Sequence, residues 1–159
     1  MGRGTIKANF SREALRRFMD GRLERINDAL IMELQTIGEK VVAHARDLRP
    51  PVSFVDQSGN LRASIGYVIY ANGKPLVKDF VDHNGPKGNN GEGRRAGEDL
   101  AEQIGKEYPK GIVLVVVAGM NYASYVEANN RDVLTSAEHL AEKLVPEMIQ
   151  ALERDILNG

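Results

Sequence analysis

The stretch that decides the fold runs from Gly111 to Asn130, GIVLVVVAGMNYASYVEANN. Its first half contains no charged residue, and a short apolar run bounded by turn residues is typical of a strand that is buried on both faces. We therefore expect a central strand here. The polar second half, NYASYVEANN, is then expected to form a corner between this strand and a C-terminal helix.

A long amphipathic helix is expected before this strand. Apolar residues recur every three or four positions from Ser11 to about Leu48, as they do along one face of an α-helix. Ser11 suits the N-cap, and Pro50-Pro51 ends the element because a residue before proline avoids the helical conformation. Such a helix spans roughly 55 Å, which exceeds the radius of gyration of roughly 15 Å for a domain of this size. Part of its apolar stripe is therefore expected to pack on another subunit.

Two strands are expected between the helix and the apolar run. Apolar residues alternate from Leu61 onward, which predicts a strand. Asn72-Gly73 is a strong hairpin signal because both residues tolerate positive φ, so a second strand, 75–81, is expected to return antiparallel.

The remaining segments are a loop and two helices. Residues 83–97 contain five glycines and are interpreted as a mobile glycine-rich loop, followed by a short helix over 98–107. A terminal helix is expected from Thr135, with Thr135 and Glu138 forming a capping box. Together these elements predict one α+β domain over residues 1–159, in which a long N-terminal helix and a C-terminal helix pack on a small antiparallel sheet. Residues 1–9 are expected to be flexible.

Composition excludes several classes of protein. The chain has no cysteine, which removes disulfides, thiolate nucleophiles and cysteine-ligated zinc. The formal net charge of −1 argues against a protein that binds polyanions. The longest apolar run, 112–118, is far shorter than the ~20 residues of a membrane helix, so we expect a soluble protein made in a cytoplasm.

No constellation of residues in the sequence points to chemistry. The glycine-rich loop carries Lys87 and Arg94-Arg95 but lacks the G-K-[ST] ending of a phosphate loop, and no serine lies in a G-x-S-x-G elbow. The histidines are scattered and form no metal-binding pair. These are His44, His83 and His139. We expect no catalytic, metal or cofactor site and hence no enzyme, the rival interpretation being a small enzyme with an unrecognised site.

The two ends of the chain carry opposite charge. Residues 1–25 hold seven Lys or Arg against three acids, a net of +4, and residues 131–159 hold three against six, a net of −3. One interpretation is two solvated faces. Another is that the opposite poles meet between neighbouring copies and favour head-to-tail assembly into a ring. A third is DNA binding by the basic first helix.

Two short motifs carry a resemblance to a known family. QSGNLRASI, over 57–65, follows Pro51-Val52 and the end of the long helix, and Y-A-x-x-V-E occurs in NYASYVEANN before the terminal helix. This arrangement resembles the HK97 gp10-like family of tailed-bacteriophage neck and tail-completion proteins, in which P-V-x-T-G-x-L-R-x-S-I precedes the strands and Y-A-x-x-V-E precedes a C-terminal helix. The residues taken as the assembly and structural motif are Gly59, Leu61, Arg62, Ser64, Ile65, Tyr122, Ala123, Tyr125, Val126 and Glu127.

The resemblance implies a ring-forming structural protein of the virion, which acts in tail completion at the head–tail junction. Its implied partners are further copies of the chain, the phage connector and the tail tube proteins, with DNA contacted only where subunits line a lumen and no membrane involved. The implied location is the virion, and the host cytoplasm during assembly. Alternatives are a tail terminator or head-closure protein of the same neck region, or a nucleic-acid-associated protein. Arg62 and Glu127 are interpreted as a charge pair beside the sheet ends.

Overall fold

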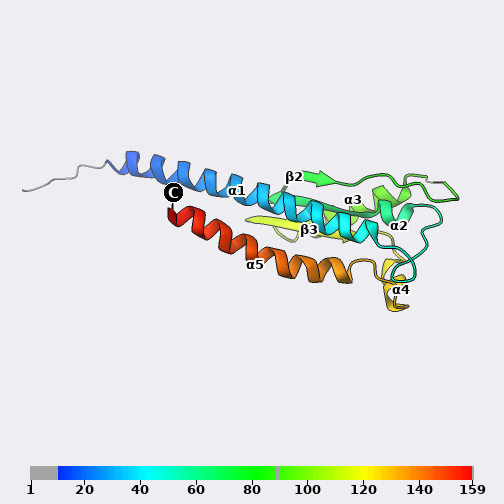
Figure 1. Ribbon diagram of the computed structural model, residues 1–159. Helices are drawn as coiled ribbons and strands as arrows, with labels where there is room; N and C mark the ends of the chain where they lie inside the picture. The colour runs from blue at the N-terminus through cyan, green and yellow to red at the C-terminus, as the bar shows by residue number, and fades with distance from the viewer. Residues whose placement is uncertain (1–10, 89, 159) are drawn as a thin grey trace, which may run out of the picture.

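The computed structural model describes residues 11–88 and 90–158, so the residues predicted to be flexible, 1–9, lie outside the described part. The fold is α+β, with a long N-terminal helix, a C-terminal helix and one three-stranded antiparallel sheet in the order β2-β1-β3 (Figure 1), as the sequence predicts. In chain order the elements are α1 (Arg12–Asp47), α2 (Asn60–Ala63), β1 (Ile65–Ala71), β2 (Lys74–Asp79), α3 (Glu92–Gly105), β3 (Ile112–Ala118), α4 (Ala123–Ala128) and α5 (Thr135–Asn158).

The long helix α1 has two unlike halves. It begins where the Ser11 side chain accepts a hydrogen bond of 3.0 Å from the Ala14 N–H, as predicted for an N-cap. All of its buried residues lie between Leu34 and Ala45, whereas residues 11–20 are exposed throughout. Figure 1 shows the N-terminal part of α1 running on past the end of α5. We call residues 12–26 the α1 arm.

The sheet lies between two helical layers. One face, which carries Ile65, Tyr67 and Ile69 of β1, packs with the second half of α1 and with residues of α5. The other face, which carries Val68 and Tyr70, packs with α3. Burial on both faces identifies β1 as the central strand.

Glycine in the middle of α1 has a packing role. A Cβ at Gly38 would lie 2.9 Å from the ring of Tyr67, closer than real contacts allow, so glycine lets the helix approach the ring. The ring is almost wholly buried, and this burial, with the nearby Glu39 and Asp79 carboxylates, raises the pKa of Tyr67 to about 12.

The first predicted strand begins later than its apolar alternation indicates. Residues 60–63 form the short helix α2, so Leu61 and Arg62 are helical and the strand starts at Ile65. The hairpin prediction is confirmed, because Asn72 and Gly73 both adopt positive φ, at 50° and 77°, and β1 and β2 pair antiparallel.

The prediction that the apolar run 112–118 is a central strand is wrong in one respect. The run does form strand β3, but β3 pairs with β1 alone and lies at the edge of the sheet. Only Val115 and Val117 are fully buried, and the other five residues are half-buried. An apolar run reports which residues avoid water, whereas the position of a strand in the sheet depends on partners distant in sequence.

The predicted loop over 83–97 is shorter in the structure, because α3 begins at Glu92. Gly93 and Gly97 lie inside this helix and are buried. A Cβ at Gly93 would lie 2.0 Å from the Asn60 carbonyl oxygen, and one at Gly97 would lie 2.5 Å from the Ser64 carbonyl oxygen. These two glycines therefore allow α3 to pack against the backbone of α2 and the start of β1, rather than making the segment flexible.

Candidate functional site

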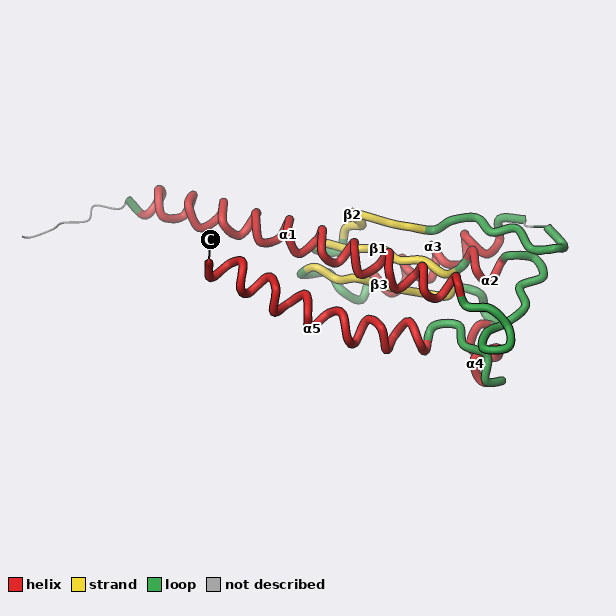
Figure 2. Tube along the Cα trace, in the orientation of Figure 1, coloured by secondary structure: helices red, strands yellow, loops and turns green. Residues whose placement is uncertain are grey.

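The two sequence motifs come together at one end of the molecule. Figure 2 shows α2 and α4 at the end opposite the α1 arm, where the loops after α1 and β3 also lie. We call residues 54–65 and 119–127 the motif end. Of the ten motif residues, only Tyr122 and Tyr125 have exposed side chains.

Arg62 ties the end of α1 to the loop that follows it. Its guanidinium donates from Nε to the Arg46 carbonyl at 3.1 Å, and from one terminal nitrogen to the carbonyls of Leu48 at 2.7 Å and Phe54 at 3.4 Å. It also lies 4.5 Å from the centre of the Phe54 ring, in cation–π contact. The residue is only 8% exposed, and this burial, with the nearby Arg49, lowers its pKa. Arg62 thus caps a helix C-terminus, where carbonyls lack partners.

Asp56 and Gly59 form the turn that starts α2. The Asp56 carboxylate accepts the backbone N–H of Gly59 at 2.9 Å and that of Arg62 at 2.7 Å. Gly59 has φ of 85°, and a Cβ there would lie 2.0 Å from the His83 carbonyl oxygen. Only glycine fits this position, because the conformation is left-handed and the backbone of a distant segment lies against it.

Ser64 joins the first motif to the second. Its hydroxyl donates to the Leu61 carbonyl at 2.8 Å and accepts the N–H of Met120 at 3.3 Å, while its carbonyl accepts the N–H of Gly119 at 3.1 Å. The side chain is fully buried. The two motifs therefore meet through the backbone just before Tyr122.

Glu127 caps helix α5. One carboxylate oxygen accepts the backbone N–H groups of Leu134 at 3.0 Å and Thr135 at 2.8 Å, and the Thr135 hydroxyl at 2.7 Å. Burial acts to raise the pKa of Glu127, but these hydrogen bonds outweigh it and hold the pKa below its ordinary value. The predicted capping box is wrong, since the N–H of Thr135 bonds Glu127 rather than Glu138.

The proposed charge pair between Arg62 and Glu127 is also wrong. Both side chains lie in the described part of the chain, and they form no ion pair with each other. Arg62 bonds three backbone carbonyls and Glu127 bonds the start of α5. Each therefore completes a helix end, which local sequence spacing did not indicate.

Two further residues of this region were missed by sequence reasoning. Arg46 donates to the Ile65 carbonyl at 2.7 Å and pairs with Asp79 at 3.1 Å, so it joins α1 to both β1 and β2. Asn60 is buried and connects to Asn90 and to the Gly93 N–H. The Asp56–Gly59 spacing is a turn signal that could have been found, but nothing local marks Arg46.

The two tyrosines of the second motif have different surroundings. The Tyr122 side chain is 37% exposed and, together with Phe54 and Val126, lines a hollow of about 340 Å³. Tyr125 is 72% exposed on α4. Tyr125 is therefore the tyrosine of this motif that faces solvent most fully.

The surface hollow between α3 and the hairpin is lined in part by carboxylates. It measures about 350 Å³ and includes Glu98 and Glu102. Glu98 pairs with Lys78 at 3.4 Å and Glu102 with Lys106 at 2.9 Å. The hydrogen bond and charge of Lys106 lower the pKa of Glu102, which keeps it ionised and unsuited to act as a general acid at neutral pH.

One histidine forms a pair that the sequence did not suggest. His44 on α1 and Ser136 on α5 are 2.8 Å apart. Neither residue lines the hollows between the helices and the sheet, and a serine nucleophile needs both an oriented base and a substrate space. We therefore interpret the contact as a hydrogen bond that joins the two long helices.

Residues 11–88 and 90–158 contain neither a cluster of metal ligands nor a membrane-spanning helix. No group of three His, Asp or Glu side chains in this part lies close enough to hold a metal ion. None of the helices described has the length and apolar character needed to cross a membrane.

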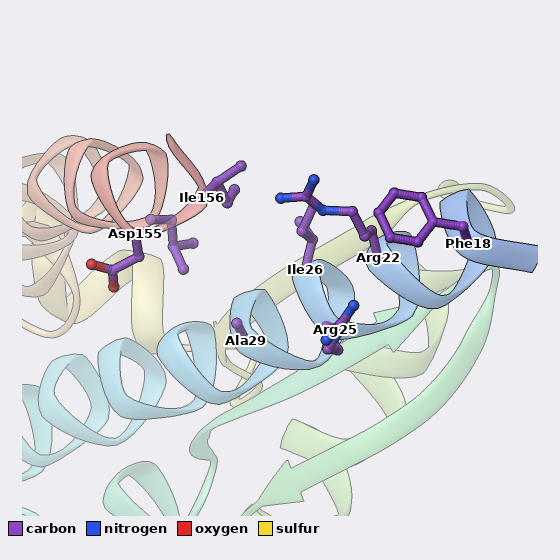
Figure 3. Close-up of a pocket in the computed structure, with 8 residues that line it drawn as sticks. Phe18, Arg22, Arg25, Ile26, Ala29, Asp155 and Ile156 are labelled. Atoms are coloured by element: carbon purple, nitrogen blue, oxygen red, sulfur yellow. The ribbon is translucent and has the colours of Figure 1, made fainter. Parts of the chain in front are cut away.

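A further hollow lies where α5 ends beside α1. Figure 3 shows Phe18, Arg22 and Ile26 along α1, with Asp155 and Ile156 at the end of α5. The space measures about 420 Å³. Its lining combines apolar residues with Arg22, Arg25 and Asp155, a composition that suits a contact between macromolecules better than a catalytic site.

In comparisons with protein-family models, curated proteins and solved structures, nothing matches this chain.

Proposed function

We propose that the chain is a structural virion protein of a tailed bacteriophage or prophage, a ring-forming subunit at the head–tail junction that acts in tail completion. The observation that carries the oligomer is the exposed apolar surface of the α1 arm. Leu15, Phe18, Met19 and Leu23 are each at least half exposed, although they continue the stripe that forms the core further along α1. Contiguous exposed apolar residues mark interaction surfaces.

The phage assignment rests on the motif resemblance. Gly59, Arg62 and Ser64 from the first motif and Glu127 from the second are each engaged in a turn, a helix end or the junction between the motifs. A scaffold held in this way favours a role defined by shape and contacts rather than by chemistry. Tyr125, exposed at the motif end, provides a contact point for a neighbouring neck protein such as the connector or the tail tube.

The test is the content of the virion. Virions banded by density from cells that carry the gene are digested and analysed by mass spectrometry, and peptides of this chain are expected in the mature particle. Disruption of the gene is expected to leave filled heads and tails of normal length that remain unjoined in electron micrographs. Absence of the chain from virions would contradict the proposal.

The same micrographs separate the alternative neck roles. Loss of a tail terminator is expected to give tails of irregular length, whereas loss of a head-closure protein is expected to give heads that lose their DNA. Either outcome would move the chain within the neck while retaining its structural role.

A further inference from the structure

On the α1 arm, arginines lie beside the apolar face and acidic residues lie on the opposite side. At 3.6 residues per turn, Leu15, Phe18 and Met19 share one face of the helix. Arginines border or interrupt this face, whereas the acidic residues lie on the opposite side, where Glu13 pairs with Arg17 at 3.8 Å. The bordering arginines are Arg12, Arg16, Arg22 and Arg25. The arm thus presents an apolar ridge edged with positive charge.

A groove of matching character lies elsewhere on the molecule. It measures about 440 Å³ and runs between β3, α5 and the second half of α1, with Leu114 and Val116 on the strand side and Ala141 and Val145 on α5. Among its lining residues, all within the described part, Glu138 alone is charged. Glu142, one turn further along α5, is exposed on the same side of the helix.

The strand beside this groove has an open edge. The Gly111 carbonyl accepts the Asn72 N–H, and the Gly119 N–H donates to Ser64, so odd-numbered residues of this segment direct their backbone groups at β1. The even-numbered residues, 112 to 118, direct theirs outward, and no backbone partner for them occurs among the described residues. Strand β3 therefore has the apolar sequence of a strand buried on both faces, but one of its edges is unpaired among the described residues.

The other edge strand, β2, has features that protect it from association. Strand β2 contains Lys74, Pro75 and Lys78, and its pairing with β1 is interrupted between Ile69 and Tyr70. Lysine, proline and irregular pairing are the features that protect an edge strand from association. Strand β3 has none of these features, and its seven pairs with β1 are regular. The unprotected edge is therefore the one beside the apolar groove.

The arm cannot fill the groove of its own chain. Leu34, the groove residue of α1 that is nearest to Phe18 along the helix, lies 16 positions further on, which corresponds to about 24 Å along a continuous helix. An arm that meets the same arm of another copy would bring two sets of arginines together. The occupant with an apolar face and the opposite charge to Glu138 is thus the arm of another copy.

We propose that the α1 arm of one copy seats in the groove between β3 and α5 of the next copy, with Phe18 as the apolar anchor and the bordering arginines facing Glu138 and Glu142. The two surfaces are different patches of the same subunit, so the contact is head-to-tail and closes into a ring where the rotation permits. This deepens the proposed function and rests on its homo-oligomer element.

The test uses two variants that each lose one surface. Phe18→Glu places a carboxylate on the ridge, and Ala141→Arg fills the groove and adds a positive charge there; Glu and Arg are both good helix formers. By light scattering after size exclusion, wild type is expected to form an oligomer and each variant alone a monomer. An equimolar mixture is expected to give a species of twice the 17.5 kDa chain mass, because the intact arm of Ala141→Arg still fits the intact groove of Phe18→Glu.

Charge reversal provides a second measurement. Arg12→Glu with Arg16→Glu is expected to abolish the oligomer, as is Glu138→Arg with Glu142→Arg, and a mixture of the two double variants is expected to recover association. Leu157→Glu, which changes an exposed residue outside both surfaces, is the matched control and is expected to assemble as wild type. Circular dichroism melts establish that every variant is folded.

The proposal has clear contrary results. A wild type that stays monomeric at the highest attainable concentration would overturn it, as would folded single variants that both assemble, or a mixture that stays monomeric. Retention on DNA or anionic vesicles that is lost in Phe18→Glu, without self-association, would assign the arm to another partner and also overturn it. In each case, detection of the chain in virions would leave the proposed structural role standing.

Discussion

The two ends of the molecule satisfy their surfaces in opposite ways. At the motif end, Arg62, Ser64 and Glu127 direct their hydrogen bonds at backbone groups of the same chain. At the other end, Phe18 of the α1 arm remains 60% exposed beside the hollow that the end of α5 lines. The short motifs therefore mark residues whose hydrogen bonds connect distant segments of the same chain. The surface that we propose for assembly is marked instead by apolar residues that are exposed in the single chain.

The largest loss of stability is expected from Arg62→Met, which removes the guanidinium that connects α1 to the motif end. Its loss leaves three carbonyls near the end of α1 without this donor, and the free energy of unfolding is expected to fall by about 4 kcal/mol. Arg49→Met is the matched control, because Arg49 donates to the Arg46 and Leu48 carbonyls from an exposed position. Its expected loss is below about 1 kcal/mol, measured by urea unfolding of both variants. Equal losses would contradict the role of burial at Arg62.

A somewhat smaller effect is expected from Gly59→Ala. The substitution combines a left-handed backbone with a Cβ that overlaps the His83 carbonyl, so a loss of about 3 kcal/mol is expected. Gly88→Ala has a similar φ of 80° but nothing within 4 Å of the new Cβ, and about 1 kcal/mol is expected there. If thermal or urea melts give the same loss for both, the close approach of the 83–85 segment is not what selects glycine.

The smallest effect is expected from Glu127→Gln, at about 1 kcal/mol near neutral pH. Because the pKa of Glu127 is lowered in the folded chain, its carboxylate contributes stability above the unfolded pKa, and this contribution is lost as the pH falls through the folded pKa. The difference from wild type is therefore expected to shrink below about pH 4.5. Melts across this range, with Glu147→Gln as a control of no effect at an exposed mid-helix position outside both proposed surfaces, measure it. A difference that is constant down to acid pH would contradict the capping role.

Much of the fold could be predicted because it depends on local patterns. The helix from Ser11, the hairpin at Asn72-Gly73 and the existence of β3 each follow from periodicity or turn chemistry within a few residues. The edge position of β3 could not be predicted in this way, since it depends on which strand pairs with β1.

The candidate site was predicted less completely for the same reason. The sequence motifs include Arg62 and Glu127, but the charge pair predicted between these two residues is wrong. Arg62 bonds carbonyls that lie 8 to 16 residues earlier, and Glu127 bonds N–H groups 7 and 8 residues later. Such bonds depend on the path by which the loops bring separate segments together. The periodicity of a helix or a strand does not contain this information.

The central claim is that assembly uses the α1 arm whereas the motif end holds the single chain together. Light scattering of Phe18→Glu beside Tyr125→Glu tests it most directly, because both variants place a carboxylate at an exposed aromatic residue, one at each end. The expected result is a monomeric Phe18→Glu and a Tyr125→Glu that keeps the wild-type oligomer. A monomeric Tyr125→Glu beside an unchanged Phe18→Glu would contradict the account.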